Sequence, residues 1–118
     1  MGSLHIGMET INDMKRRSTV VVTECEFHYD LFVKLCISTD NYPYTKFSLC
    51  VSQRGNLSIE SKYQNRWYHD YNLPGNFSFL FDFDCDRVSR FIKDNFIEMY
   101  LDNSESDICE RMKKRFYA

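Results

Sequence analysis

The sequence predicts one α+β domain, in which an antiparallel sheet of about four strands is covered on one face by helices. Three observations support this prediction. Apolar side chains alternate with polar ones over much of residues 19–63, a period of two that is typical of strands with one buried face. From residue 87 onward, apolar side chains recur every three or four residues, as in amphipathic helices. The length of 118 residues suits a single core.

Composition and charge narrow the function classes. The chain is 43% hydrophobic and 27% charged, which are ordinary values for a globular protein. Its formal charge of -2 gives no overall attraction to nucleic acid or to an anionic membrane, so neither is expected as a partner. The aromatic fraction of 16% is high, and such side chains either fill a small core or anchor a partner protein.

The five cysteines are an odd number at irregular spacing, and none forms a Cys-x-x-Cys pair. We therefore expect reduced thiols and a reducing compartment, either the nucleus or the cytoplasm. No apolar run approaches the length of a membrane span, and the first residues lack the apolar core of a signal peptide. Residues 1–7 are interpreted as a cloning remnant or a disordered start, and residues 8–118 as one interaction domain.

The expected elements of the first half are a short helix over 8–17, a long strand over 19–37, a turn over 38–44, and a hairpin of strands over 47–51 and 57–63 about Gly55-Asn56. Pro43 marks the turn because proline has no N–H to donate to a strand ladder. Polar residues break the alternation over 64–76, which predicts a connecting loop. Its tryptophan, Trp67, either folds back on the core or anchors a partner.

The stretch FSFLFDFDCD, residues 77–86, is expected to be a strand that runs into a helix. Its four phenylalanines would share one buried face, and its aspartates would face water. Asp84 or Asp86 would cap the next helix, expected over 87–101. A last helix would start at Ser104 or Ser106, with Ile108, Met112 and Phe116 along one side.

Metal-binding patterns are incomplete in this chain. A calcium loop of EF-hand type starting at Asp82 would need glycine and glutamate where Arg87 and Lys93 stand. Cys25 and His28 have the spacing of half a zinc site, but strand side chains three residues apart face opposite ways. We therefore expect no metal site and no cofactor.

Catalytic patterns are also incomplete. Tyr68-His69-Asp70 suggests acid-base chemistry, yet no nucleophile elbow, glycine-rich phosphate loop or HExxH sequence accompanies it. The chain is therefore interpreted as not an enzyme, with no catalytic residues assigned. A small enzyme centred on the 64–76 loop, with Trp67, His69 and Asp70, is the alternative.

The last two helices offer candidate contacts for a partner. Ile97 and Leu101 point away from the side expected to meet the sheet, so either the final helix covers them or they form an apolar spot for a partner or a second copy. The basic side of the final helix is either solvated or binds an acidic or phosphorylated segment. With Trp67, the candidate partner-binding residues are Ile97, Leu101, Arg111, Lys113, Lys114 and Arg115. One basic helix is too little for duplex readout.

The order of helix, antiparallel meander and two helices resembles the RWD domain, a relative of the ubiquitin-conjugating fold. The family tends to carry a Tyr-Pro turn after its second strand, where this chain has Tyr42-Pro43, although Phe47 stands where the family has a later proline. Residues 86–118 look like the endings of kinetochore members, in which a sheet-packed helix precedes a short basic helix.

This resemblance implies a protein-docking or dimerising module, like the heads that end coiled coils in kinetochore and spindle-checkpoint proteins. Conjugating activity is not expected, because Cys85 lies between aspartates rather than in the context that activates a nucleophilic thiol. A pathogen-encoded or effector binding protein of similar architecture is the other alternative.

Overall fold

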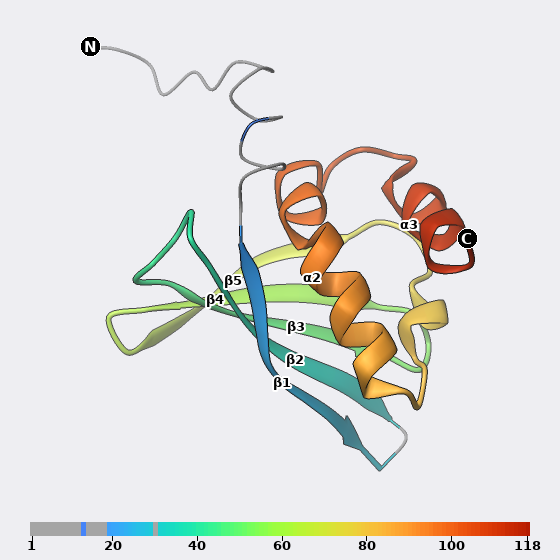
Figure 1. Ribbon diagram of the computed structural model, residues 1–118, viewed down its shortest axis with the longest axis horizontal. Coiled ribbons are helices and arrows are strands. Elements are labelled where there is room, and N and C mark those ends of the chain that lie inside the picture. The colour runs from blue at the N-terminus through green and yellow to red at the C-terminus, as the bar shows by residue number, and fades with distance from the viewer. Residues whose placement is uncertain (1–12, 14–18, 30) are drawn as a thin grey trace.

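The computed structural model describes residue 13, residues 19–29 and residues 31–118. Over these residues one antiparallel sheet has its strands in chain order (Figure 1). The strands are β1 Val20–His28, β2 Phe32–Thr39, β3 Lys46–Ser52, β4 Leu57–Tyr63 and β5 Arg66–Leu73. The 3₁₀ turn η1 Ser78–Leu80 and the helices α2 Cys85–Leu101 and α3 Ile108–Phe116 follow. The α+β class, the meander and the two C-terminal helices are confirmed, whereas the expected count of about four strands becomes five.

The helices lie against one face of the sheet (Figure 1). Alternate residues of the strands supply the sheet side of the core, namely Val33, Leu35, Ile37, Phe47, Leu49, Val51, Leu57 and Ile59. The helix side comes from Val88, Ile92, Phe96, Met99, Ile108, Met112 and Phe116, all buried. This is the arrangement expected when a half-apolar sheet and amphipathic helices bury their apolar sides together. No described helix is long and apolar enough to span a membrane.

The long strand expected over 19–37 is two strands joined by a tight turn. Tyr29 has a φ of 50°, and the Leu31 N–H donates to the His28 carbonyl at 2.8 Å, which closes the turn. Tyr29 and Leu31 are exposed by 94% and 62%. They continue the apolar alternation of the flanking strands, so the sequence pattern does not mark the turn between β1 and β2.

The loop expected over 64–76 contains strand β5. Gln64 and Asn65 both have positive φ, 51° and 63°, and form a two-residue hairpin turn between Tyr63 and Arg66. β5 is an edge strand, and its residues 66–69 are exposed, so it lacks the apolar alternation that marks a strand with a buried face. The expected hairpin about Gly55-Asn56 is confirmed between β3 and β4.

The strand expected over 77–83 is irregular backbone with the short η1 turn. Its N–H groups make local bonds, from Leu80 to the Phe77 carbonyl and from Phe81 to the Ser78 carbonyl, each at 2.9 Å. The four phenylalanines therefore do not share one face, and Phe83 is 69% exposed.

The start of α2 follows the capping prediction. The Asp84 carboxylate accepts a hydrogen bond from the Arg87 N–H at 3.2 Å and caps the helix, which begins at Cys85. The helix expected over 8–17 lies, apart from Asp13, outside the described residues.

Candidate interaction surfaces

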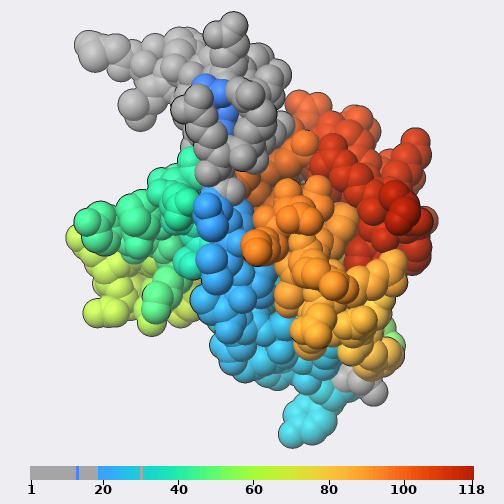
Figure 2. Space-filling model, viewed as in Figure 1, coloured from blue at the N-terminus to red at the C-terminus, as the bar shows by residue number. Residues whose placement is uncertain are grey.

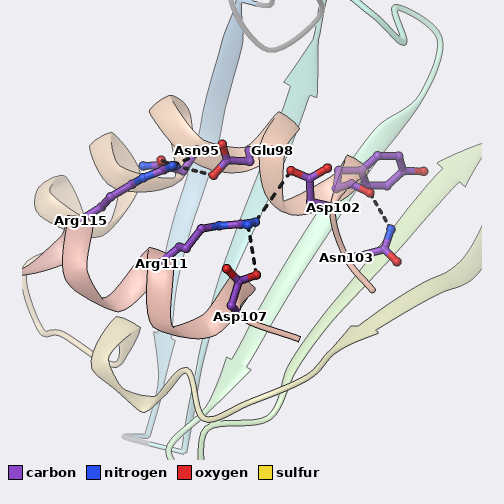
Figure 3. Close-up of polar contacts among 8 residues, drawn as sticks. Asn95, Glu98, Asp102, Asn103, Asp107, Arg111 and Arg115 are labelled. Carbon is purple, nitrogen blue, oxygen red and sulfur yellow. Dashed lines mark hydrogen bonds and ion pairs between the residues drawn. The ribbon is translucent and has the colours of Figure 1, made fainter. Parts of the chain in front are cut away.

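Arg115 of α3 is held within the protein rather than offered to a partner. Its guanidinium donates to the Asn95 carboxamide oxygen at 3.1 Å and pairs with the Glu98 carboxylate of α2 (Figure 3). The Glu98 side chain is only 20% exposed, so this pair lies at the junction of the two helices. Arg115 therefore contributes to the packing of α3 on α2.

Arg111 has a similar structural position. It pairs with Asp107 at 3.1 Å and lies 3.8 Å from a carboxylate oxygen of Asp102, at the C-terminus of α2 (Figure 3). Its side chain is 32% exposed. Two of the four basic residues expected to bind a partner thus fasten the connection between α2 and α3.

Lys113 and Lys114 remain exposed on α3. Within the described residues neither lysine has an ion pair, although Glu110 stands beside Lys113 on the wall of a hollow of about 400 Å³. Tyr117 and the η1 region form other parts of that wall. The positive surface of α3 is therefore smaller than the sequence suggested.

Ile97 and Leu101 do not form an open apolar spot. Ile97 is only 4% exposed and belongs to the core, and Leu101 is half-buried against the same core. The structure thus favours the alternative in which these side chains are covered. Ile97 can contact a partner only if this packing opens.

Trp67 lies on β5, on the face of the sheet opposite the helices. It stands directly across from Lys62 on β4, whose ammonium lies 5.8 Å from the centre of the indole ring. The side chain is 46% exposed and borders a hollow of about 240 Å³ that also contacts Lys34, Cys50 and Glu60. Trp67 does not fold back on the core, which leaves the partner-anchor interpretation open.

A surface that the sequence analysis missed surrounds this tryptophan. We call residues 42–46 and 62–68 the sheet end, because the β2–β3 and β4–β5 turns bring them together on the side of the sheet that projects away from the helices (Figures 1 and 2). Its exposed aromatic side chains are Tyr44 at 85%, Tyr63 at 47%, Trp67 at 46% and Tyr68 at 46%. Its cations are Lys46, Lys62 and Arg66, and it contains no Asp or Glu.

The sequence did hold a signal for this surface. The segments YPYTK and KYQNRWY combine aromatic and basic residues without an acidic residue, in a chain whose net charge is -2. Each segment alone reads as an ordinary turn or loop. They become one surface only because Lys46 and Lys62 are paired across β3 and β4.

Of the residues of the alternative enzymatic site, Trp67 and His69 share the face of the sheet opposite the helices, whereas the Asp70 side chain points toward α2. His69 is exposed and pairs with Glu60 in the sheet, whereas Asp70 lies at an irregularity in the β4–β5 register. The Asp70 carboxylate accepts hydrogen bonds from the Ser61 hydroxyl at 3.1 Å and from the Tyr100 hydroxyl at 3.3 Å. Burial, with the nearby Asp70 charge, raises the pKa of Tyr100. Asp70 therefore connects α2 to the sheet and does not orient His69.

Four thiols, those of Cys25, Cys36, Cys50 and Cys109, have a raised pKa. The Cys85 thiol donates to the Cys25 carbonyl at 3.6 Å, and burial together with the Cys85 thiol raises the pKa of Cys25 to about 12. Burial also raises the pKa of Cys36, Cys50 and Cys109. The His28 ring contacts Glu26 at 2.8 Å, away from Cys25. Over the described residues no three metal-ligating side chains come together.

The sequence matches no protein-family model, and no curated protein or solved structure is significantly similar to it. The RWD resemblance therefore stays a prediction. The two features that suggested it are present as local structure: Tyr42-Pro43 lies in the turn after β2, and α2 and α3 end the chain.

Proposed function

We propose that this protein is a non-enzymatic protein-interaction module that holds a segment of another protein on its sheet end. The observation that carries the proposal is the composition of this surface. The exposed Tyr44 and Trp67 lie near Lys46 and Lys62 on the face of the sheet opposite the helices, whereas Tyr63, Arg66 and Tyr68 extend the sheet end on the other face of β4 and β5. None of these residues is a carboxylate, in a chain whose net charge is -2. Tyrosine, tryptophan and arginine are the residues that most often carry the binding energy of protein interfaces.

The size of the surface favours a peptide-like segment as the ligand. An aromatic side chain buries about 150–250 Å² when fully covered, so the two partly exposed rings of Tyr44 and Trp67 offer on the order of 200–300 Å². A standard interface buries about 800 Å² on each partner. The sheet end is smaller than this, which suits a short segment bound with moderate affinity rather than a second globular domain.

A second copy of the chain fits this surface poorly. In a twofold dimer the same patch faces itself, so Lys46 and Lys62 would meet their own positive copies. Like charges brought together at an interface disfavour that pairing. We therefore propose a different protein as the partner, with acidic groups that complement these cations.

The RWD resemblance suggests where that partner is found. Heads of this family end coiled coils in kinetochore and spindle-checkpoint proteins, so we propose a partner from the nucleus or cytoplasm, with Lys113 and Lys114 as a second contact. The alternative of a pathogen-encoded or effector protein uses the same surface and differs in the partner.

The test is quantitative affinity capture from a lysate of proliferating cells of the source organism, followed by direct titration of the enriched protein's segment against purified chain. The sheet-end variant is Tyr44→Ala with Trp67→Ala. The matched control is Tyr29→Ala with Phe83→Ala, which removes two exposed aromatic side chains elsewhere. We expect the dissociation constant to rise at least about ten-fold for the first variant only.

Equal affinities for the two variants would overturn the proposed surface. A wild-type dimer in light scattering that becomes monomeric in the sheet-end variant would establish self-association instead. Turnover of a substrate that is lost on His69→Ala, with the fold intact, would establish the enzymatic alternative.

A further inference from the structure

We propose that the sheet end binds a phosphorylated side chain of its partner protein. This inference rests on the proposed function, because it names the chemistry that the protein-interaction surface recognises. The site is the hollow between the β2–β3 turn and the β4–β5 turn, a volume of about 210 Å³.

All the side chains that line this hollow can donate hydrogen bonds. Two are ammonium groups, two are carboxamides and one is a phenol: Lys46, Lys62, Gln64, Asn65 and Tyr44. None is a carboxylate. A lining in which every side chain can donate, and which carries two formal positive charges, is complementary to an oxyanion.

The two lysines form an arrangement that folding alone does not favour. Lys46 and Lys62 stand directly opposite each other on β3 and β4 and point to the same face. Like charges in such positions destabilise a sheet. Within the described residues neither lysine has an ion pair. Glu60, two residues before Lys62 on the same face, instead lines the neighbouring hollow beside Lys34.

Charge and shape favour a phosphate over a carboxylate. A phosphomonoester carries about -1.5 to -2 charges and three acceptor oxygens at neutral pH. It can therefore neutralise both lysines at once and still accept bonds from the carboxamides. A single carboxylate carries one charge and would leave one lysine uncompensated.

The surroundings favour a protein segment over a nucleic acid. The face of the sheet opposite the helices also carries Glu24, Glu26 and Glu60, opposite Cys36, Lys34 and Ser48 in the sheet register. A polyanion that ran along this face would meet these carboxylates, and the net charge of the chain is -2. A single phosphate on a polypeptide avoids them, and its neighbouring residues can pack on Trp67 and Tyr44.

The fluorescence of Trp67 is the quantity measured in the binding experiment. Trp67 is the only tryptophan, and the Lys62 ammonium is 5.8 Å from its ring, so an anion bound at Lys62 changes the electrostatic environment of the indole. We would titrate the purified chain at low salt with five probes: N-acetyl-phosphoserine N-methylamide, its unphosphorylated form, N-acetyl-glutamate N-methylamide, inorganic phosphate and a single-stranded oligonucleotide.

We expect saturable binding of the phosphoserine probe in the millimolar range, at least about ten-fold tighter than the glutamate probe, and none for the unphosphorylated form. Lys46→Gln, which leaves Lys62 and Trp67 in place, should lower the affinity for the phosphoserine probe about ten-fold. The matched control Lys93→Gln, an exposed lysine of α2, should leave the affinity for this probe unchanged.

Four outcomes would overturn the inference: absence of saturable phosphoserine binding, equal affinity for the glutamate probe, inorganic phosphate as tight as phosphoserine, or a single-stranded oligonucleotide tighter than both. If the phosphoserine probe fails while a partner segment still depends on Tyr44 and Trp67, only the inference fails. If the probe binds but no protein segment does, the proposed function fails.

Discussion

Replacing Gly75 by alanine tests how α3 is held on the domain. Gly75 follows β5 and has a φ of +111°, a conformation that a residue with a Cβ rarely adopts. An added Cβ would lie 2.4 Å from Cys109 Cβ and 2.7 Å from Cys109 Sγ. Because Cys109 Cβ is fixed to the backbone of α3, a change of rotamer cannot relieve the closer contact. The helix or the loop must move.

The magnitude follows from three contributions. Left-handed backbone costs alanine about 1–2 kcal/mol. Forcing apart packed groups costs about 1–3 kcal/mol more, because α3 buries Ile108, Met112 and Phe116 in the core. The reduced freedom of the unfolded chain returns about 0.4–1 kcal/mol. The free energy of unfolding should therefore fall by about 3 kcal/mol, within a range of about 1–5 kcal/mol.

Urea unfolding measures this change, and the rate of thiol labelling at Cys109 reports on α3 itself. The control is Gly55→Ala, with a φ of +98°, where the new Cβ would meet the end of the Asn76 side chain at 1.9 Å. That side chain can turn away, at the loss of its 2.9 Å bond to the Ser78 N–H. Only Gly75→Ala should speed labelling of Cys109, which is 5% exposed. A loss below about 1 kcal/mol, or equal labelling in both variants, would refute the steric reasoning.

Three further predictions concern the helices and the thiols. Reversing Lys113 and Lys114 to glutamate should leave the melting temperature almost unchanged, whereas Arg115→Glu should lower the free energy of unfolding by about 1 kcal/mol because it places a like charge against α2. Equal melting curves for Arg115→Glu and the wild type would contradict the internal role of Arg115. An unchanged partner affinity when Lys113, Lys114 and Arg115 are all reversed to glutamate would remove α3 from the interaction surface. Asp84→Ala should reduce the free energy of unfolding by about 1 kcal/mol in urea, and a change near zero would exclude its capping role. Since the folded pKa of Cys25 is raised from 9.0 to about 12, the unfolded chain releases this proton first, so stability should fall as the pH rises above 9. Urea unfolding at pH 8 and pH 10 measures the fall, Cys25→Ser should reduce it, and a rise in stability over this range would contradict the assignment.

Each difference between the predicted and the observed elements has a local cause. The turn at Tyr29 went unseen because Tyr29 and Leu31 keep the alternation of their neighbours while pointing into solvent. β5 went unseen because it is an edge strand whose first residues are exposed, so its sequence carries little apolar periodicity. The phenylalanines of 77–83 read as a strand, yet two consecutive residues, Phe79 and Leu80, are both buried, which alternation cannot produce.

The sequence by itself determined what neighbouring residues decide. The α+β class, the β3–β4 hairpin, the Asp84 cap and the two C-terminal helices follow from periodicity and capping chemistry within about ten residues. Only the tertiary structure decided which charged side chains pair within the protein and which stay exposed. It placed Arg115 against Glu98 and Asn95, and it left the sheet end exposed. Residues 42–46 and 62–68 are separated along the chain, and only the pairing of β3 with β4 makes them one surface.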